Sequence, residues 1–358
     1  MKRYILMFII IFAPVKVLAL SASSSIVMDL DNGRVLSGYN IDEERLIAST
    51  TKIMTALIAI EKGNLEDEIE VSDIIYKAYG SAIYIEKGEK LKLKDLLHGL
   101  MLRSGNDAAL VIAEYISGTK EEFVYLMNEY ANNLKMNNTI FYNPHGLDEK
   151  SGLGNMASAK DLAILTKYAM ENQVFREIFK TKEYKVTTNY KTYLWYNKNK
   201  LLSLDYITGG KTGFTEKARR TLVTTGSKGN MNLVVVTLND PNDWNDHKTL
   251  YQSIFNSYKS YELIDKENFK INKNEYFKKD KLFVKNDYFM TLKESELKNI
   301  KLDIKLFKLD NYISDMQVGY INVLLNDKLY HKEPIYVLKY EAKEKETWYQ
   351  KFRSWLFK

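Results

Sequence analysis

The segment Ala48-Ser49-Thr50-Thr51-Lys52-Ile53-Met54-Thr55 stands at the start of a predicted helix. The apolar residues that follow recur at the spacing of one buried helical face, and Gly63 lies just beyond the pattern. Residues three positions apart at a helix start face the same side, so Lys52 can reach the hydroxyl of Ser49. Serine is a good nucleophile only when a base takes its proton, and burial or a like charge can lower the pKa of a lysine enough to do this. The segment therefore predicts a serine nucleophile with a lysine base.

The S-x-x-K spacing alone does not identify an active site. It recurs at Ser117–Lys120 and at Ser295–Lys298, and we interpret both copies as solvated surface. For Ser49 taken by itself, an ordinary helix cap is the alternative interpretation.

A second candidate element is Ser104-Gly105-Asn106, the only S-x-N triplet in the sequence. It lies between two predicted helices, residues 91–103 and 108–116, where a hydroxyl and an amide can project into a cleft. The hydroxyl of Ser104 can relay a proton, and the amide of Asn106 can hold a substrate backbone. In isolation the triplet also fits a plain turn.

A third candidate element is Lys211-Thr212-Gly213, which is followed by Phe214-Thr215 and by strand-like sequence. Lys211 offers a positive charge to a carboxylate, and its repulsion would lower the pKa of Lys52. Gly213 would let a substrate backbone lie close against the strand. Two threonines add hydroxyl donors, Thr212 and Thr215. An edge strand that carries a lysine is the simpler interpretation of this triplet taken alone.

Together, and in this order, the three elements are much more specific than any one of them. They match the set S-x-x-K, S-x-N and K-T-G that marks serine β-lactamases and penicillin-binding proteins. With them, the sequence resembles the low-molecular-weight penicillin-binding proteins of the serine D-alanyl-D-alanine carboxypeptidase family. The resemblance covers nearly the whole chain and includes Asn143-Pro144-His145-Gly146-Leu147-Asp148 and Ser158-Ala159-Lys160-Asp161-Leu162-Ala163.

The resemblance implies a role for each residue of the three elements. Ser49 would be the acylated nucleophile, with Lys52 as its general base. Ser104 would pass a proton to the leaving D-alanine, and Asn106 would hold the peptide amide. The remaining positions would bind the terminal carboxylate and the substrate backbone: Lys211, Thr212, Gly213, Phe214 and Thr215. The backbone N–H groups of Ser49 and Phe214 would form the oxyanion hole.

Two features depart from the pattern of some relatives. Phe214 stands where some relatives carry a histidine, which leaves a backbone oxyanion donor intact. Some relatives also carry an arginine near the carboxylate, but residues 239–247 contain none, and His247 is the substitute that we consider there. We interpret His145 as a structural loop residue.

The order of predicted elements indicates an α+β fold. A hairpin is predicted around Asp31-Asn32-Gly33, because Asn and Gly both tolerate positive φ. Ser158 followed three residues later by Asp161 is typical of a helix start. Further elements are a helix at 121–134 and strands at 25–30, 34–39, 220–225 and 232–238. The order predicts a serine β-lactamase/transpeptidase-like domain over residues 20–262, in which an antiparallel sheet packs with a helical group.

The sequence changes character after residue 262. Four apolar residues alternate with charged residues, which is the period of a half-buried strand: Ile300, Leu302, Ile304 and Leu306. Later strand-like segments end near residue 340. Residues 263–341 therefore form a predicted small all-β domain.

Both ends of the chain carry predicted targeting segments. Residues 1–19 combine a basic start, a short apolar run and a small-residue cleavage site, which is the pattern of a signal peptide; an uncleaved anchor is the alternative. Residues 342–358 are a predicted amphipathic helix at a membrane surface, because four apolar residues share one face among basic ones: Trp348, Phe352, Trp355 and Leu356. A terminal helix packed on its own domain is the alternative. We therefore expect an exported protein on the outer face of the cell membrane.

Composition excludes several other classes of site. The chain has no cysteine, so thiol nucleophiles, disulfides and thiolate metal sites are excluded. Its four histidines are far apart and show no metal-ligand spacing, so we expect no metal and no cofactor. The net charge of +6 is spread along the chain without a nucleic-acid-binding motif, so we expect no nucleic-acid partner.

The predicted function is removal of the terminal D-alanine from peptidoglycan stem pentapeptides through an ester on Ser49, with β-lactam antibiotics as acylating inhibitors. A DD-endopeptidase or transpeptidase is the nearest alternative. A serine β-lactamase is disfavoured because no E-x-x-L-N loop follows Ser104. A non-catalytic peptidoglycan-binding protein is disfavoured because all three motifs are intact.

Overall fold

The computed structural model describes residues 20–149, 152–271, 276–277 and 280–340. The predicted signal peptide and the predicted amphipathic helix at 342–358 lie outside the described residues. Within the described ranges, none of the helices combines the length and the apolar character needed to cross a bilayer.

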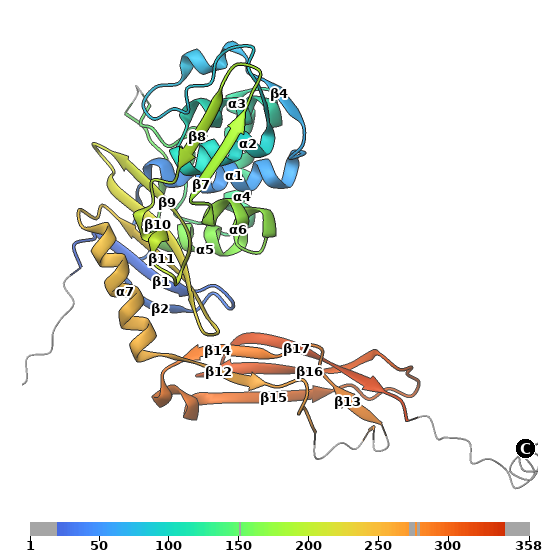
Figure 1. The fold of residues 1–358 in the computed structure, drawn as a ribbon. Helices are drawn as coiled ribbons and strands as arrows, with labels where there is room; N and C mark the ends of the chain where they lie inside the picture. Colours follow the sequence, from blue (N-terminus) through green and yellow to red (C-terminus); the bar gives the residue numbers. More distant parts are fainter. Residues whose placement is uncertain (1–19, 150–151, 272–275, 278–279, 341–358) are drawn as a thin grey trace, which may run out of the picture.

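A five-stranded antiparallel sheet forms the centre of the first part of the chain (Figure 1). Its first two strands come from the predicted hairpin, where Gly33 has a φ of 73° and its N–H donates to the carbonyl of Asp29. The strand at residues 24–29 pairs with the strand at residues 231–238, which comes last among the five in the chain. The two ends of this part of the chain therefore lie together. The order is β2 (Val35–Tyr39), β1 (Ser24–Asp29), β11 (Met231–Leu238), β10 (Arg219–Lys228) and β9 (Ile207–Thr215).

Helices cover both faces of this sheet, so the central strands β1 and β11 are buried on both sides. Met28 and Val234 belong to the larger core beneath the helical group, whereas the adjacent Val27 and Val235 pack with Tyr251 of α7 on the opposite face. In Figure 1, α7 lies on one side of the sheet and the other helices on the other side. The helices are α1 (Lys52–Lys62), α2 (Leu93–His98), α3 (Asn106–Ser117), α4 (Lys120–Asn133), α5 (Ala159–Ala169), α6 (Gln173–Lys180) and α7 (Asp243–Ser257).

The predicted start of α5 is confirmed, because the Ser158 side chain accepts a hydrogen bond from the N–H of Asp161 at 3.1 Å. The predicted helix over 91–103 is only partly correct. Residues 90–92 form the short strand β5, which pairs with β4 (Glu68–Glu70), and a π-helical turn over Gly99–Arg103 follows α2. Apolar spacing alone could not separate these three conformations, because all three segments contribute buried leucines.

Short elements complete this part of the molecule. The 3-10 turn η1 (Ala48–Thr51) precedes α1, and a hairpin of β7 (Glu183–Thr187) and β8 (Thr192–Tyr196) lies beside the helices (Figure 1). The others are β3 (Arg45–Leu46), β6 (Met156–Ala157), η2 (Asp73–Lys77) and η4 (Lys200–Ser203).

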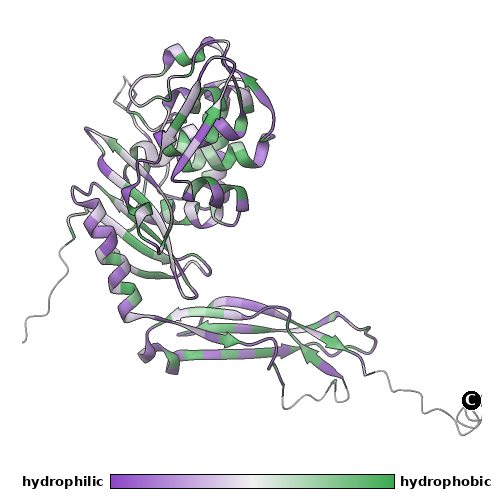
Figure 2. Ribbon diagram, viewed as in Figure 1, coloured by the Kyte–Doolittle hydropathy of each residue, from purple (hydrophilic) through white to green (hydrophobic). Residues whose placement is uncertain are grey.

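The chain after α7 forms antiparallel β-structure with a core of its own, and the whole protein is therefore α+β, as predicted. Residues 300–306 form the predicted strand β15, and their alternation is visible in Figure 2. However, Leu302 and Ile304 are 45% and 41% exposed, because β15 is an edge strand and gains cover from one neighbour only. The strands are β12 (Lys259–Ile264), β13 (Lys281–Phe283), β14 (Tyr288–Leu292), β15 (Ile300–Leu306), β16 (Met316–Leu325) and β17 (Lys328–Leu338), and the 3-10 turn η5 (Glu294–Asn299) precedes β15.

Candidate active site

Ser49 lies in the 3-10 turn η1, one turn before the regular helix begins at Lys52. The predicted helix start is therefore tighter than an α-helix, but it still brings the two side chains together. Lys52 Nζ lies 3.1 Å from Ser49 Oγ. Ser49 is half-buried and faces the cleft, whereas the side chain of Lys52 is fully buried. A hydroxyl that lines the cleft thus lies beside an amine that is buried from solvent.

The surroundings of Lys52 favour its neutral form. Burial is the largest cause that holds its pKa well below the ordinary value, followed by the positive charges of Lys211 and Lys198; Asp107 opposes the shift. Its Nζ lies 2.7 Å from Asn106 Oδ1 and 2.6 Å from the carbonyl oxygen of His145. A neutral amine has two N–H donors, which match these two oxygens. Its lone pair is then left for the hydroxyl proton of Ser49.

The backbone around Ser104 is strained in a way that serves the site. Ser104 ends the π-helical turn in a left-handed conformation with φ 65° and ψ 36°. Such a conformation costs on the order of 1–3 kcal/mol for a non-glycine residue, and both features are concentrated at functional sites. The strain presents Ser104 Oγ to Lys211 Nζ, which donates a hydrogen bond to it at 3.0 Å.

Lys211 is the second buried lysine of the site. Its Nζ also donates to the carbonyl oxygen of Thr212 at 2.7 Å. Burial lowers its pKa to about 7, with a further contribution from the charge of Lys198. A pKa near neutrality suits a group that must both hold and release a proton.

Asn106 is held on both sides as the first residue of α3. Its Oδ1 accepts from Lys52, and its Nδ2 donates to the carbonyl oxygen of Tyr79 at 2.6 Å. Its backbone N–H donates to the carbonyl oxygen of Ser81 at 2.8 Å. The orientation of the amide is therefore fixed, and one Nδ2 hydrogen is left for a ligand.

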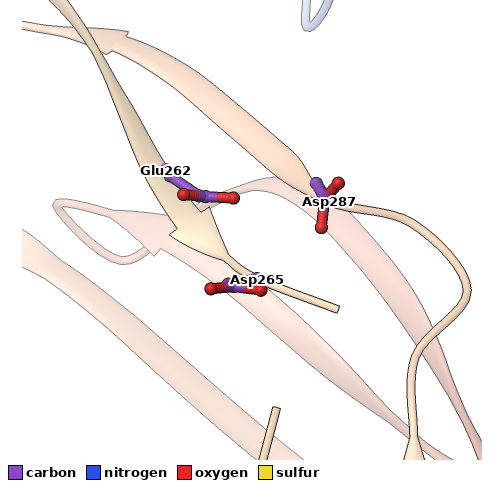
Figure 3. Close-up of side chains that lie close together, drawn as sticks. All are labelled: Glu262, Asp265 and Asp287. Atoms are coloured by element: carbon purple, nitrogen blue, oxygen red, sulfur yellow. The ribbon is translucent and has the colours of Figure 1, made fainter. Parts of the chain in front are cut away.

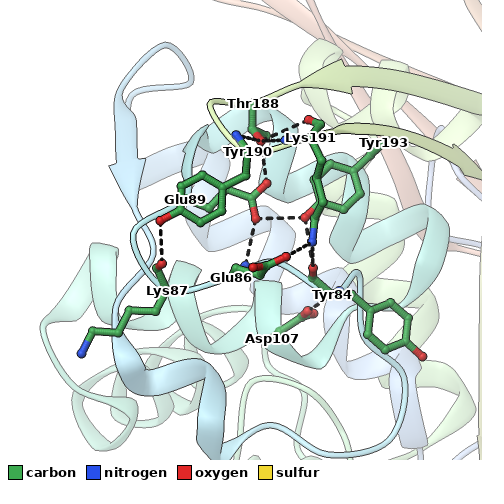
Figure 4. A network of polar contacts seen from close by, with 9 residues as sticks. All are labelled: Tyr84, Glu86, Lys87, Glu89, Asp107, Thr188, Tyr190, Lys191 and Tyr193. Atoms are coloured by element: carbon green, nitrogen blue, oxygen red, sulfur yellow. Dashed lines mark hydrogen bonds and ion pairs between the residues drawn. The ribbon is translucent and has the colours of Figure 1, made fainter.

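The loop over residues 79–89 is fixed by a polar network (Figure 4). Asp107 accepts hydrogen bonds from backbone N–H groups of this loop, including that of Tyr84 at 2.8 Å. At the other end, the fully buried Glu89 accepts from the hydroxyl of Tyr193 in β8 at 3.0 Å. The network therefore ties the loop to α3 and to the β7–β8 hairpin.

Two glycines permit close approach of backbone to the η1 turn that contains Ser49. A Cβ on Gly213 would lie 2.3 Å from Thr221 Oγ1 and 3.0 Å from the backbone N of Ser49. Gly146 has a φ of 87°, and a Cβ there would lie 1.9 Å from the carbonyl oxygen of Ala48. A side chain at position 146 would therefore collide with the η1 turn, which explains the glycine in the segment 143–148.

His145 contributes its backbone rather than its ring. Its carbonyl oxygen accepts from Lys52, and its ring Nδ1 accepts from the N–H of Leu147 at 3.1 Å. Burial lowers the pKa of the ring to about 3, so the ring is neutral. The interpretation of His145 as a loop residue does not include the contact of its carbonyl oxygen with Lys52. The segment Asn143-Pro144-His145-Gly146 was the available sequence signal for that contact.

The three predicted elements meet at one cleft with a volume of about 430 Å³. Lys52, Asn106 and Lys211 are buried and hydrogen-bond to one another's motifs or to cleft residues: Lys52 to Ser49 and Asn106, and Lys211 to Ser104. Thr215 is not among the lining residues, and its Oγ1 accepts from the N–H of Ala218 at 3.0 Å. The cleft is lined by Ser49, Ser81, Ser104, Lys198, Lys200, Thr212, Gly213, Phe214, Arg220 and Trp244.

Comparison with known proteins identifies the family of this chain. The family model described as D-alanyl-D-alanine carboxypeptidase matches residues 12–242. The chain belongs to the D-alanyl-D-alanine carboxypeptidase family. A second model, described as the C-terminal domain of penicillin-binding protein 5, matches residues 258–343. The family resemblance predicted from the motifs is thereby confirmed, and with it the class of serine carboxypeptidase among the penicillin-binding proteins.

Relatives of this carboxypeptidase match most of its length. D-alanyl-D-alanine carboxypeptidase DacF of Bacillus subtilis is 33% identical over 317 residues, which cover 84% of this chain and 80% of the relative. DacC of Escherichia coli is 30% identical and covers 93% of this chain and 89% of the relative. The solved structure of penicillin-binding protein 5 from Haemophilus influenzae has a TM-score of 0.71 at 25% identity, covering 90% of this chain and 97% of that one.

Arg220 is a cleft residue of this carboxypeptidase that sequence reasoning missed. The suggested substitute, His247, is fully buried in α7, where its ring nitrogens lie 2.8 Å from Thr224 Oγ1 and 3.0 Å from Thr237 Oγ1. Arg220 instead lines the cleft from β10, where it pairs across the strands with Phe214. Its place in the cleft depends on the register between β9 and β10, and the sequence alone does not reveal that register.

The guanidinium of Arg220 is positioned by contacts with Asp243 and Trp244. Its Nε and Nη2 donate to Oδ1 of the buried Asp243 at 3.0 and 2.7 Å. Its centre lies 5.1 Å from the ring of Trp244, within the range of a cation–π interaction. This arrangement leaves Nη1 of Arg220 without a hydrogen-bond partner among the described residues.

One group of acidic side chains in this carboxypeptidase is close enough to share a cation. Among the described residues, Glu262, Asp265 and Asp287 bring ligand oxygens within 4.8 Å of one another (Figure 3). They belong to the β-structure after α7 and do not line the catalytic cleft. Asp265 already accepts from the backbone N–H groups of Glu267 and Asn268.

Proposed function

We propose that this carboxypeptidase removes the terminal D-alanine from the stem pentapeptides of peptidoglycan through an ester on Ser49. The observation that carries the proposal is the hydrogen bonding of Lys52. Two carbonyl oxygens take the two donors of its neutral amine, and the third contact of Nζ is Ser49 Oγ at 3.1 Å. Lys52 is therefore a base that is already aligned with the nucleophile.

Acylation proceeds as the hydroxyl proton of Ser49 passes to Lys52 and Oγ attacks the carbonyl carbon of the penultimate D-alanine. The oxyanion that forms accepts hydrogen bonds from the backbone N–H groups of Ser49 and Phe214. As the C–N bond breaks, Ser104 passes a proton to the leaving amine, and Lys211 replaces the proton of Ser104. The proton held by Lys52 returns to Lys211 through the cleft, which leaves Lys52 neutral again. Water then attacks the ester and gives a proton to Lys52, and Lys52 passes it to Ser49 Oγ as the ester breaks, which releases the shortened peptide and restores Ser49.

The substrate is held by groups that surround Ser49. Asn106 uses its remaining Nδ2 hydrogen on a substrate carbonyl, and Gly213 lets the substrate backbone approach β9. Thr212 and Lys211 bind the terminal carboxylate, and we add Arg220 to this set because it lines the same cleft and its Nη1 has no described partner. Thr215 acts indirectly, since its hydroxyl already holds the turn that leads to Arg220.

Penicillin follows the same path as far as the ester. Its lactam carbonyl takes the place of the scissile carbonyl and its carboxylate the place of the terminal carboxylate. Because the amine released from the lactam ring stays attached, it does not leave the cleft to make room for water. The adduct on Ser49 therefore persists.

The test of this function is product analysis with a soluble peptide that ends in D-Ala-D-Ala, with and without an added amine. We expect one D-alanine released for each peptide shortened, with a free carboxylate on the product. An amide with the added amine as the main product would instead indicate a transpeptidase. Absence of D-alanine release would contradict the proposal.

We also propose that the chain is exported and acts on the outer face of the cell membrane. In this proposal the chain divides into a signal peptide (1–19), a catalytic domain (20–262), a β-domain (263–341) and a membrane-associating helix (342–358). The basic start and apolar run support the first assignment, and the aromatic face among lysines supports the last.

Removal of 342–358 is expected to release the enzyme from anionic vesicles while hydrolysis of a soluble peptide is unchanged. Sedimentation with the vesicles measures the first effect. A matched variant with Trp348, Phe352 and Trp355 changed to serine keeps the charge, and it should also lose binding, because the apolar face supplies the insertion energy. Vesicle binding that is undiminished in the truncated enzyme would contradict the assignment.

A further inference from the structure

Lys198 lines the cleft but belongs to none of the three motifs. It lies between β8 and η4, and its Nζ donates a hydrogen bond to Ser81 Oγ at 3.1 Å. Its backbone N–H donates to the carbonyl oxygen of Leu102 at 3.2 Å. No carboxylate within the described part of the chain forms an ion pair with Lys198, so its charge is not neutralised locally.

These two hydrogen bonds connect Lys198 to both segments that present catalytic groups. Leu102 belongs to the π-helical turn that ends in Ser104. Ser81 belongs to the loop over 79–89, and its carbonyl accepts from the N–H of Asn106. A single residue of the cleft wall therefore contacts the supports of both Ser104 and Asn106.

The charge of Lys198 also acts on both buried lysines. It is the largest electrostatic contribution to the lowered pKa of Lys211, after burial, and it lowers the pKa of Lys52 after burial and Lys211. Of the other groups around the site, Asp107 opposes the shift at Lys52, and the ring of His145 is neutral. Burial, and after it the charge of Arg103, lower the pKa of Lys198 itself.

We propose that Lys198 is a positioning residue for acylation, which ties the Ser81 loop to the Ser104 turn and places an unpaired positive charge beside the two buried amines. The proposal rests on the function assigned to Ser49 and Lys52. The mechanism needs Lys52 as a neutral base, and a positive charge in the cleft wall disfavours a second positive charge on Lys52. Lys198 thus extends the acylating form of the enzyme to lower pH.

The test is the rate of acylation by a fluorescent penicillin as a function of pH. In the wild type, the rate rises with pH as Lys52 loses its proton. Loss of the neighbouring charge in Lys198→Met raises the pKa of Lys52, so this rise should move upward by roughly one pH unit. At pH values below the rise, acylation of the variant would be about 10-fold slower than acylation of the wild type. At high pH the variant would regain the rate of the wild type.

Two matched variants separate charge from packing. Lys198→Arg keeps the charge, so the rise should stay where it is in the wild type. Lys200→Met removes a neighbouring cleft cation that does not contribute to the lowered pKa of either buried lysine, so the rise should again stay in place. A rise that is unmoved in Lys198→Met, or moved equally in Lys200→Met, would overturn the proposal.

The salt dependence of the wild-type rate gives a test that does not depend on the correct folding of a variant. Added salt screens a half-exposed charge, so it should move the rise of the wild type upward. An unchanged rise from low to high salt would also overturn the proposal. Failure of the function itself is distinguishable, because the wild type would then form no penicillin adduct at any pH.

Discussion

The variant Ser49→Ala is expected to lose both D-alanine release and penicillin acylation, by a factor on the order of 10⁴–10⁶. The reason is that Ser49 Oγ forms the bond to substrate in both reactions, and among the described residues no other hydroxyl hydrogen-bonds with Lys52 Nζ. Initial rates of D-alanine release and the yield of labelled penicillin adduct give the two measurements. The removed hydroxyl is half-buried and makes no other described hydrogen bond, so the fold should persist.

The chain supplies its own control for this prediction. Ser295 and Lys298 repeat the S-x-x-K spacing, but both are exposed and make no contact with the cleft. Ser295→Ala should therefore retain the activity of the wild type. Retention of either reaction in Ser49→Ala would contradict the assigned nucleophile.

The variant Arg220→Ala is expected to lower kcat/KM for a peptide with a free terminal carboxylate by about 10- to 150-fold. This range corresponds to loss of one hydrogen bond between charged groups, worth about 1.5–3 kcal/mol. A peptide whose terminal carboxyl is amidated should lose much less, because it offers no charge to the guanidinium. Steady-state kinetics on the two peptides therefore separate carboxylate recognition from general damage.

Arg219→Ala and Arg220→Lys provide matched comparisons. Arg219→Ala removes the adjacent exposed arginine, which does not line the cleft, and should leave kcat/KM nearly unchanged. Arg220→Lys should restore little, because a lysine cannot donate to Asp243 through two nitrogens and still present a third. An equal loss on the free and amidated peptides in Arg220→Ala would refute the carboxylate role.

The three motifs were predictable because each depends on local chemistry. The spacing of Ser49 and Lys52 survives the difference between the predicted α-helix and the observed 3-10 turn, since both place residues three apart on one side. The neighbourhood of Lys211 and Lys52 followed from the resemblance to a known set of motifs. The hairpin at Gly33 and the start of α5 at Ser158 followed from turn and capping chemistry.

The remaining parts of the site depend on tertiary contacts that sequence patterns do not encode. Arg220 enters the cleft because β10 pairs with β9 in one register, and a shift of one residue would turn its side chain to the other face. His145 acts through a carbonyl, which every residue has, so its side chain gave no hint. Lys198 became significant only when the loop containing Ser81 was found beside it.

Burial was the other quantity that the sequence could not supply. The alternation along β15 predicted a half-buried strand. However, β15 lies at the edge of its sheet with a neighbouring strand on one side only, so Leu302 and Ile304 remain exposed. The same limit applies to Lys52, because only the packed structure removes it from solvent and so favours its neutral form. The hypothesis of a lysine base thus required the fold for its physical justification.

Mass spectrometry of the penicillin-treated enzyme, with proteolytic mapping of the added mass, is the most direct check on the partnership of Ser49 and Lys52. We expect one penicillin per chain, attached to the peptide that contains Ser49 and to that residue within it. An adduct on Ser104 or another side chain, or no covalent adduct at a pH where Lys52 is neutral, would contradict the account.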